Sequence, residues 1–286
     1  MSYIARARQF RAKKRLGQNF LIDENIIEKI IENAELSADE TVIEIGAGLG
    51  FVTEKLADKA NKVIAIELDP DAIKELNSLE LSNIEIINQD ILKTNFSNLV
   101  NEPVKVIANI PYYITSPILV HLLGEIDQAD YENRKFIKEI ILMVQYEVAK
   151  RIVATEKSQN KEYGLLSILA NFWAETELIC KVPARSFFPS PKVDSALVKL
   201  TIREKPIIQL DNPKLFKRII VACFGMRRKN IKNALIGGGF SPEIITVALQ
   251  KADIDSSRRG ETLSIEEFKV LSEFIQKETE NADNKS

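Results

Sequence analysis

The sequence predicts an α/β protein in which a parallel sheet carries helices on both faces and is followed by a small all-helical domain. Short apolar runs of strand length alternate with helix-like segments from residue 41 to about residue 144, which is the pattern of repeated βα units. A glycine cluster follows the first of these runs, as at the nucleotide site of doubly wound folds. Beyond residue 205 the strand patterns stop and helical ones continue. With 286 residues, of which 45% are hydrophobic, the chain can bury the core of both domains.

The elements of the first domain are assigned from apolar spacing. The first helix, 23–34, carries Ile26, Ile27 and Ile30 at helical spacing behind Asp23, a suitable N-cap. Strands are expected at 41–45, 62–66, 84–88, 104–108, 140–144 and 193–200. Further helices are expected near 50–59, 70–77, 116–123 and 164–173, with a polar surface loop at 155–165. Right-handed crossovers then bring the carboxyl ends of the strands to one edge of the sheet.

The division into domains follows from changes in composition. Residues 1–22 form a basic arm, residues 23–205 form the α/β domain, and residues 206–278 form the helical domain. The helices of that last domain are expected at 212–224, 227–236, 242–251 and 264–276. The polar end of the chain, 279–286, is expected to be disordered.

Composition argues against several classes of protein. A net charge of −2 and a pI of about 5.8 do not suit a globally basic nucleic-acid binder, so any nucleic acid must be bound by local patches. Cys180 and Cys223 lie far apart and form neither a disulfide framework nor a metal-ligand pattern. The only histidine, His121, lies in an apolar run and is expected to be structural. We therefore expect no bound metal.

The targeting signals are few. No run approaches the ~18 apolar residues of a membrane span, so we expect no membrane partner. The basic N-terminus lacks the apolar core of a secretory signal. We expect a cytoplasmic monomer; an organelle transit peptide is the alternative reading of the basic, acid-free N-terminus.

The glycine cluster is the first candidate site. Gly46, Gly48 and Gly50 follow the apolar run 42–45, and they permit a tight turn that brings a ligand close to the main chain and to a helix N-terminus. Phe51 stands where the dinucleotide fingerprint requires a third glycine, so an NAD site fits poorly. The spacing by itself leaves NAD and S-adenosylmethionine open, and also a turn with no ligand.

Polar side chains mark the ends of the strands that follow. Glu67, Asp90 and Asn109 each stand where an apolar strand stops. Any one of them could be a strand-end cap, but together with the glycine turn they indicate one site at the carboxyl edge of the sheet. A carboxylate at Glu67 can accept hydrogen bonds from the ribose hydroxyls of a nucleotide.

The most informative stretch is Asn109-Ile110-Pro111-Tyr112-Tyr113, which looks like the N/D-P-P-Y/F signature of methyltransferases that act on exocyclic amines. The lone pair of an adenine N6 amine is delocalised into the ring, so the amine is a weak nucleophile. The side-chain carbonyl of Asn109 and the main-chain carbonyl of Ile110 could accept both N6 hydrogens and favour a pyramidal nitrogen. Pro111 would hold the bend rigid, and Tyr112 would stack on an extruded base. A proline turn with two partly buried tyrosines is the structural alternative.

Over nearly its whole length the chain resembles the small-subunit rRNA adenine dimethyltransferase family (KsgA/RsmA). The motifs that carry the resemblance are 17–21 (GQNFL), 44–48 (EIGAG), 66–69 (IELD), 89–90 (QD), 109–112 (NIPY), 187–195 (FFPSPKVDS) and 224–233 (FGMRRKNIKN). The resemblance implies a Rossmann-like class I methyltransferase sheet with a C-terminal helical domain. Ala47 stands where many members have proline, and a small residue there changes little.

The resemblance also implies roles for individual residues. Those expected to bind S-adenosylmethionine are Asn19, Leu21, Gly46, Gly48, Glu67, Asp90 and Asn109. The expected catalytic residues are Asn109, Ile110, Pro111 and Tyr112. Phe187 would stack on the target base opposite Tyr112, whereas Asp194 and Ser195 are expected to order a loop.

The substrate implied by the resemblance is a pair of adjacent adenosines in the hairpin near the 3′ end of 16S rRNA, each methylated twice at N6 within the 30S subunit. This implies a part in rRNA processing and ribosome biogenesis. The expected RNA-binding residues are Arg11, Lys13, Lys14, Arg15, Arg227, Arg228, Lys229 and Lys232. The alternatives are a 23S rRNA adenine methyltransferase of the macrolide-resistance type, a ribosome-assembly factor with secondary catalysis, and an NAD-dependent oxidoreductase.

Overall fold

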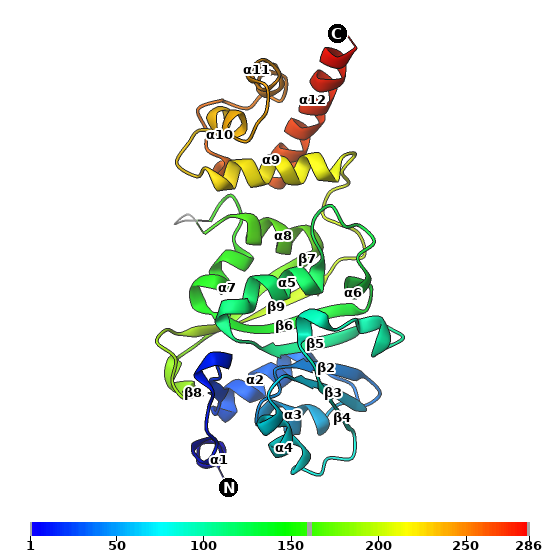
Figure 1. Ribbon diagram of the computed structural model, residues 1–286, viewed down its shortest axis with the longest axis vertical. Helices are drawn as coiled ribbons and strands as arrows, with labels where there is room; N and C mark the ends of the chain where they lie inside the picture. Colours follow the sequence, from blue (N-terminus) through cyan, green and yellow to red (C-terminus); the bar gives the residue numbers. More distant parts are fainter. Residues whose placement is uncertain (1, 159–161, 285–286) are drawn as a thin grey trace. The chain divides into compact units, whose positions relative to one another are not determined.

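The apolar runs of the sequence form one mixed β-sheet in the computed structural model, which describes residues 2–158 and 162–284 (Figure 1). Within these residues the strand order is β4 (Ile84–Asn88), β3 (Lys62–Glu67), β2 (Thr41–Ile45), β5 (Val104–Asn109), β6 (Ile137–Gln145), β9 (Ser195–Ile202) and β7 (Ala174–Val182). The strands from β4 to β6 run parallel, and β9 is antiparallel to both of its neighbours.

The prediction of a parallel sheet from the repeated βα units is therefore confirmed for β2 to β6. The strand predicted at 193–200, for which the sequence indicated no direction, is β9 and runs antiparallel. The segment between β7 and β9 carries no α-helix, and a parallel pair would need a long crossover. Strand β7 was not predicted, because its alternation of polar and apolar residues follows a helix without any turn signal.

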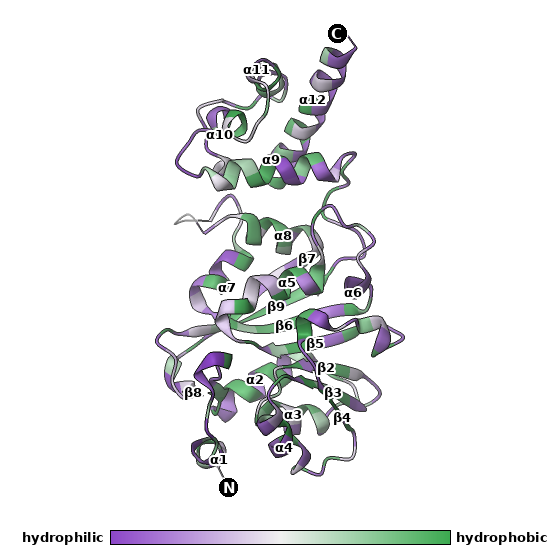
Figure 2. Cartoon of the chain, viewed as in Figure 1, coloured by the Kyte–Doolittle hydropathy of each residue, from purple (hydrophilic) through white to green (hydrophobic). Residues whose placement is uncertain are grey.

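Helices cover both faces of the sheet, as predicted (Figure 1). Helices α2 (Glu24–Ala34), α3 (Phe51–Ala57) and α4 (Pro70–Asn77) lie on one face, and α5 (Thr115–Leu123) and α6 (Glu132–Lys135) lie on the other. The apolar residues of the central strands follow one another in the chain, and successive side chains of a strand point to opposite faces of the sheet. Both faces of these strands are therefore apolar. Figure 2 shows the hydrophobic colour along β6 and the hydrophilic colour on α4 and α6.

The N-terminal arm is ordered rather than frayed. It contains helix α1 (Tyr3–Gln9), which the sequence analysis missed. The ring of Tyr3 stacks on Phe51 with centroids 4.5 Å apart, and the Arg6 guanidinium binds the Glu54 carboxylate at 2.5 Å. These contacts with α3 hold α1 in place, and no local sequence pattern in the arm predicts them.

The remaining elements of the α/β part are short. They are β1 (Phe20–Leu21), which pairs with β8 (Phe187–Phe188), helix α7 (Tyr146–Val153), and the 3-10 turns η1 (Lys14–Leu16), η2 (Ile91–Lys93), η3 (Phe96–Asn98), η4 (Tyr112–Ile114) and η5 (Ala184–Ser186). Across the described ranges, no helix combines the length and the apolar composition that a membrane span requires.

Contacts between residues divide the chain into two compact units. The first comprises Met1–Gly124, Asp130–Lys150 and Ala174–Arg203, and the second comprises Glu125–Ala129, Arg151–Trp173 and Glu204–Ser286. The division after Arg203 lies two residues before the boundary predicted between 205 and 206, and the second unit also includes residues 125–129 and 151–173, which the sequence analysis assigns to the α/β domain. Helix α8 (Leu165–Trp173) belongs there because Phe172 packs against Phe216 and its carbonyl accepts the Ile207 N–H at 3.0 Å.

The second unit contains the predicted C-terminal helices. These are α9 (Pro213–Gly225), α10 (Ile231–Gly237), α11 (Pro242–Lys251) and α12 (Ile265–Asp283), with the turn η6 (Gly260–Thr262). Helix α10 begins four residues later than the predicted 227, because the Asn230 side chain accepts the Asn233 N–H and caps the helix there. The expectation of disorder from 279 is wrong up to Asp283: helix α12 continues, and Lys251 of α11 binds Glu278 near its end at 2.7 Å.

A buried carboxylate braces the turn between β2 and α3. The Thr53 hydroxyl, in the first turn of α3, donates to Glu44 Oε2 at 2.5 Å, and both side chains are buried. Burial raises the pKa of the Glu44 carboxyl to about 7, with a smaller contribution from the charge of Glu67. The folded state therefore binds a proton here that the unfolded chain releases at lower pH.

Glu44→Gln should change how stability depends on pH. Because the folded pKa is about 7 and the ordinary value is 4.5, the wild type should lose unfolding free energy as the pH rises through this window, by about 2 to 3 kcal/mol. The glutamine can still accept a hydrogen bond from the Thr53 hydroxyl but does not titrate. The unfolding free energy of the variant should therefore increase relative to that of the wild type from pH 5 to pH 8. Urea denaturation at both pH values measures this. Glu32→Gln, at an exposed position on α2, is the matched control, and parallel pH profiles for Glu44→Gln and wild type would contradict the assignment.

Candidate active site

A pocket of about 890 Å³, partly open to solvent, lies at the carboxyl ends of β2, β3 and β5. Its wall is built from the arm, the β2–α3 glycine turn, and the loops that follow β3, β4 and β5. The residues predicted from sequence that line it are Asn19, Gly46, Gly48, Glu67, Asp90, Asn109, Ile110, Pro111 and Tyr112. The structure thus brings the glycine turn and the polar strand ends together, as the parallel arrangement required.

Two glycines allow the turn to fit against its neighbours. Gly46 has φ +75°, and a Cβ built there would lie 2.9 Å from the main-chain oxygen of Asn109. Gly48 has φ +56°, and its Cβ would lie 3.1 Å from the ring of Phe20 in the arm. Any larger residue would be strained at both positions and would push the turn away from β5 or from the arm.

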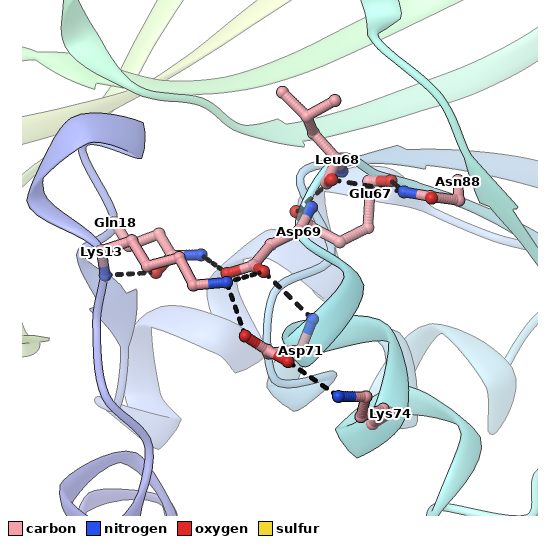
Figure 3. Close-up of polar contacts among 8 residues, drawn as sticks. All are labelled: Lys13, Gln18, Glu67, Leu68, Asp69, Asp71, Lys74 and Asn88. Atoms are coloured by element: carbon pink, nitrogen blue, oxygen red, sulfur yellow. Dashed lines mark hydrogen bonds and ion pairs between the residues drawn. The ribbon is translucent and has the colours of Figure 1, made fainter.

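Glu67 is held by main-chain donors. Its side chain is buried, with 8% of the residue exposed, and Oε2 accepts the Gly48 N–H at 2.8 Å. Oε1 accepts the N–H groups of Leu68 and Asp69, each at 2.8 Å (Figure 3). Burial raises the pKa of Glu67, while these N–H groups favour its ionised form. The carboxylate is therefore fixed in one orientation at the edge of the pocket.

Asp90 and Asn109 present unused hydrogen-bonding groups. Oδ1 of Asp90 caps η2 by accepting the Leu92 N–H at 3.0 Å, and its other oxygen has no partner among the described residues. The side-chain amide of Asn109 likewise has no hydrogen-bond partner within the described part of the chain, although it lies on the pocket. Both groups are available to a ligand.

The segment after Asn109 is fixed by a hydroxyl pair. Pro111 has φ −58° and leads into η4, and the Tyr112 hydroxyl lies 2.6 Å from the buried Ser195 Oγ. Burial raises the pKa of Tyr112. Ser195 therefore positions the tyrosine ring, and Asp194 binds Lys181 and accepts the Ala184 N–H, which fits the expected loop-ordering role of both residues.

The structure does not place Leu21 or Phe187 on the pocket. The two residues pair with each other between β1 and β8, and they are only 2% and 3% exposed within the core beside α2. The strand register turns both side chains inward, which the motif alone does not indicate.

Sequence reasoning also missed several residues that do line the pocket, namely Leu16, Gly17, Gln18, Leu68, Gln89, Ile91, Tyr113, Ile114 and Ile118. Most of these residues lie within or beside the motifs at 17–21, 89–90 and 109–112, and that position in the sequence could have indicated them.

The predicted RNA-binding cations differ in their surroundings. Arg11, Lys14 and Arg15 are exposed along an open groove beside α4, whereas Lys13 is bound to Asp69 at 2.5 Å and Asp71 at 2.7 Å. In the second unit, the predicted cations are Arg227, which binds Glu261 and the Tyr163 carbonyl, the exposed Arg228 and Lys229, and the half-buried Lys232. No group of three or more metal-ligating side chains occurs among the residues that the structure describes.

Comparison with known proteins agrees with this geometry. The family model described as ribosomal RNA adenine dimethylase matches residues 9–277. The chain belongs to the ribosomal RNA adenine dimethylase family. It is 44% identical over 280 residues to the "Ribosomal RNA small subunit methyltransferase A" of Bacillus pumilus, covering 94% of this chain and 92% of that one. It is 43% identical to the protein of that name from Clostridioides difficile, covering 93% and 91% of the two chains.

Two solved structures of related methyltransferases resemble the fold. A dimethyladenosine transferase from Plasmodium falciparum gives a TM-score of 0.72 with 28% identity, covering 89% of this chain and 96% of that one. The 23S rRNA methyltransferase ErmE gives a TM-score of 0.67 with 30% identity, covering 90% and 100%. Membership of this family confirms the resemblance found in the sequence and the class I methyltransferase fold. The family and the fold together imply that a methyltransferase of this kind uses S-adenosylmethionine.

The Tyr112–Ser195 pair can be tested by a double-mutant cycle. Tyr112→Phe and Ser195→Ala should each lower the unfolding free energy by about 1 kcal/mol, because each removes one hydroxyl of the pair and leaves the other hydroxyl without its hydrogen-bond partner. The double variant should cost little more than either single one, since the same interaction is lost. Urea denaturation measures the cycle. Tyr113→Phe, at the 65%-exposed neighbouring tyrosine, should have no effect, and strictly additive losses at 112 and 195 would rule the pair out.

Proposed function

We propose that the protein catalyses S-adenosylmethionine-dependent N6,N6-dimethylation of two adjacent adenosines in the hairpin near the 3′ end of 16S rRNA. The observation that carries the proposal is the Asn109 amide at the end of β5, which has no side-chain partner among the residues that the structure describes and lies beside Pro111 and Tyr112 on the pocket. The substrate is supported by relatives named for small-subunit rRNA that match nearly the whole chain. The protein would act on the 30S subunit in the cytoplasm, as a monomer, and take part in ribosome biogenesis.

The pocket residues fit the cofactor. Glu67 offers a fixed carboxylate to the ribose hydroxyls. Oδ2 of Asp90, which accepts no hydrogen bond from the described part of the chain, offers an acceptor to the adenine amine. Gly46 and Gly48 leave room for the methionine part to approach the main chain, and Asn19 borders it from the arm. Leu21 contributes by anchoring the arm in the core.

The reaction needs a positioned amine more than a general base. S-adenosylmethionine, when bound, supplies an electrophilic methyl group, and the sulfur leaves as a thioether when that group is transferred. The Asn109 side-chain carbonyl and the Ile110 main-chain carbonyl accept the hydrogens of the target amine and direct its lone pair into the pocket. The N6 proton is lost to solvent after the new C–N bond forms. Tyr112, held through Ser195, supplies the ring on which the extruded base stacks. Phe187 is buried, so we assign it no contact with the base.

RNA phosphates would be bound by cations that the fold leaves exposed. On the arm these are Arg11, Lys14 and Arg15. In the second unit they are Arg228 and Lys229, with Lys232 beside them. Arg227 binds within its own unit, so a contact with RNA would have to compete with Glu261. Lys13 is bound to the carboxylates of Asp69 and Asp71 and is not one of these exposed cations.

The reaction is tested by transfer of labelled methyl groups to small subunits that lack the modification, with the labelled bases mapped. Two adjacent adenosines near the 3′ end of 16S rRNA should be labelled. Label on large-subunit rRNA instead would favour the ErmE-like activity, a second candidate because that structure shares the fold at 30% identity. No label on any RNA would favour an assembly factor.

Two variants separate catalysis from cofactor binding. Asn109→Ala should lower transfer at least about a hundredfold, because the amine loses its acceptor, while the dissociation constant for S-adenosylmethionine stays within about tenfold of the wild-type value. Glu67→Ala should instead weaken cofactor binding by about tenfold or more. Isothermal titration and single-turnover transfer measure the two effects. Asn98→Ala, at an exposed asparagine of η3, is the control; normal turnover of Asn109→Ala would remove the amine-acceptor mechanism.

The arm can be tested by the salt dependence of RNA binding. The double change Lys14→Gln and Arg15→Gln should weaken binding to small-subunit rRNA and reduce the slope of log affinity against log salt by about 1 to 2. The matched control is Lys59→Gln with Lys62→Gln, at the amino end of β3 on the opposite edge of the sheet. If the control pair changed the slope as much as the arm pair, the effect would reflect net charge and not a phosphate contact at the arm.

A further inference from the structure

Asp69 is a buried carboxylate between the arm and the cofactor pocket. It is 0% exposed and follows β3 by two residues (Figure 3). Its Oδ1 accepts the Asp71 N–H at 3.0 Å and so caps helix α4. A cap of this kind needs only one acceptor, which asparagine or serine would also provide. The additional contacts of Asp69 therefore require another explanation.

The side chain of Asp69 binds two residues of the arm. Lys13 Nζ donates to Oδ1 at 2.5 Å, and Gln18 Nε2 donates to Oδ2 at 2.7 Å. Gln18 Oε1 in turn accepts the Lys13 main-chain N–H at 2.7 Å, so both ends of the segment 13–18 are tied together. Burial would raise the pKa of Asp69, but these donors lower it below its ordinary value. The carboxylate stays ionised because the arm supplies its partners.

The same residue also reaches the cofactor site from its main chain. The Asp69 N–H donates to Glu67 Oε1 at 2.8 Å, the oxygen that also accepts the Leu68 N–H. On the arm side, the residues from Leu16 to Phe20 line the pocket. Asp69 therefore contacts the carboxylate proposed for the ribose and the segment that forms the facing wall.

We propose that Asp69 is a positioning residue that couples closure of the N-terminal arm to binding of S-adenosylmethionine. The ion pair and the Gln18 bond hold the arm as a wall of the pocket, so the cofactor meets a formed site. The inference rests on the proposal that this pocket binds the cofactor. Lys13 then acts within the protein and not on RNA, which corrects the role expected for it from the sequence.

Asp69→Asn isolates this role. Asparagine has nearly the same shape and still caps α4, but it loses the negative charge that binds Lys13. Trypsin cleavage of the protein without cofactor, followed at Lys14 and Arg15 by mass spectrometry, should accelerate about tenfold, because cleavage follows the population of the open arm. The dissociation constant for S-adenosylmethionine should rise by about tenfold, within the usual range of coupling between two sites.

Two further variants decide between positioning and general structure. Asp71→Asn removes an exposed partner of Lys13 but leaves Asp69 in place, and it should behave nearly as the wild type. Combining Asp69→Asn with Gln18→Glu moves the carboxylate onto the arm, where it can accept both the asparagine amide and the Lys13 N–H, and should restore most of the affinity and protease resistance. A simple loss of packing would not be rescued in this way.

The outcomes separate this inference from the proposed function. Wild-type cleavage of Asp69→Asn would overturn the anchoring of the arm, whatever the pocket binds. Faster cleavage with unchanged cofactor affinity would overturn the coupling. If the wild type did not bind S-adenosylmethionine, the assignment of the pocket, and with it the coupling, would fail, while the cleavage result would still decide the anchoring.

Discussion

The carboxylate of Glu67 ties the parts of the site together, because its hydrogen-bond donors come from two separate turns. One donor is Gly48 of the β2–α3 turn, and the others are Leu68 and Asp69 at the start of the β3–α4 turn. A buried carboxylate without such donors would be costly, so both turns must form for the charge to be tolerated. The glycine turn, the polar strand ends and the pocket between them therefore depend on one set of main-chain contacts.

The N-terminal arm is part of the site and not an appendage. Hydrophobic packing fixes its first half, through Tyr3 on Phe51, and a buried carboxylate fixes its second half, through Lys13 and Gln18. These two anchors place the residues from Leu16 to Phe20 on the pocket. The sequence of this basic segment suggested RNA binding, but two of its cations, Arg6 and Lys13, are bound to carboxylates within the fold, and others are exposed beside them.

Charge is distributed locally in a protein whose net charge is only −2. The exposed cations of the arm lie along an open groove next to α4, and those of the second unit lie in the turn before α10. Several other cations are bound to carboxylates within their own unit, for example Arg258 to Glu267. The balance between bound and exposed cations, and not the total charge, decides which surfaces can attract a phosphate backbone.

The amino-acid sequence was sufficient to predict the alternation of strands and helices, the glycine turn, and the polar residues Glu67, Asp90 and Asn109 at the strand ends. These features depend on local spacing and on the rule that parallel strands end at one edge, so they could be predicted without coordinates. Three features became known only from the fold: the antiparallel direction of β9, the burial of Leu21 and Phe187, and the carboxylate partner of Lys13. Each of these depends on pairing between segments far apart in the chain, where register and packing select one partner among many. A local sequence pattern does not indicate which partner is selected.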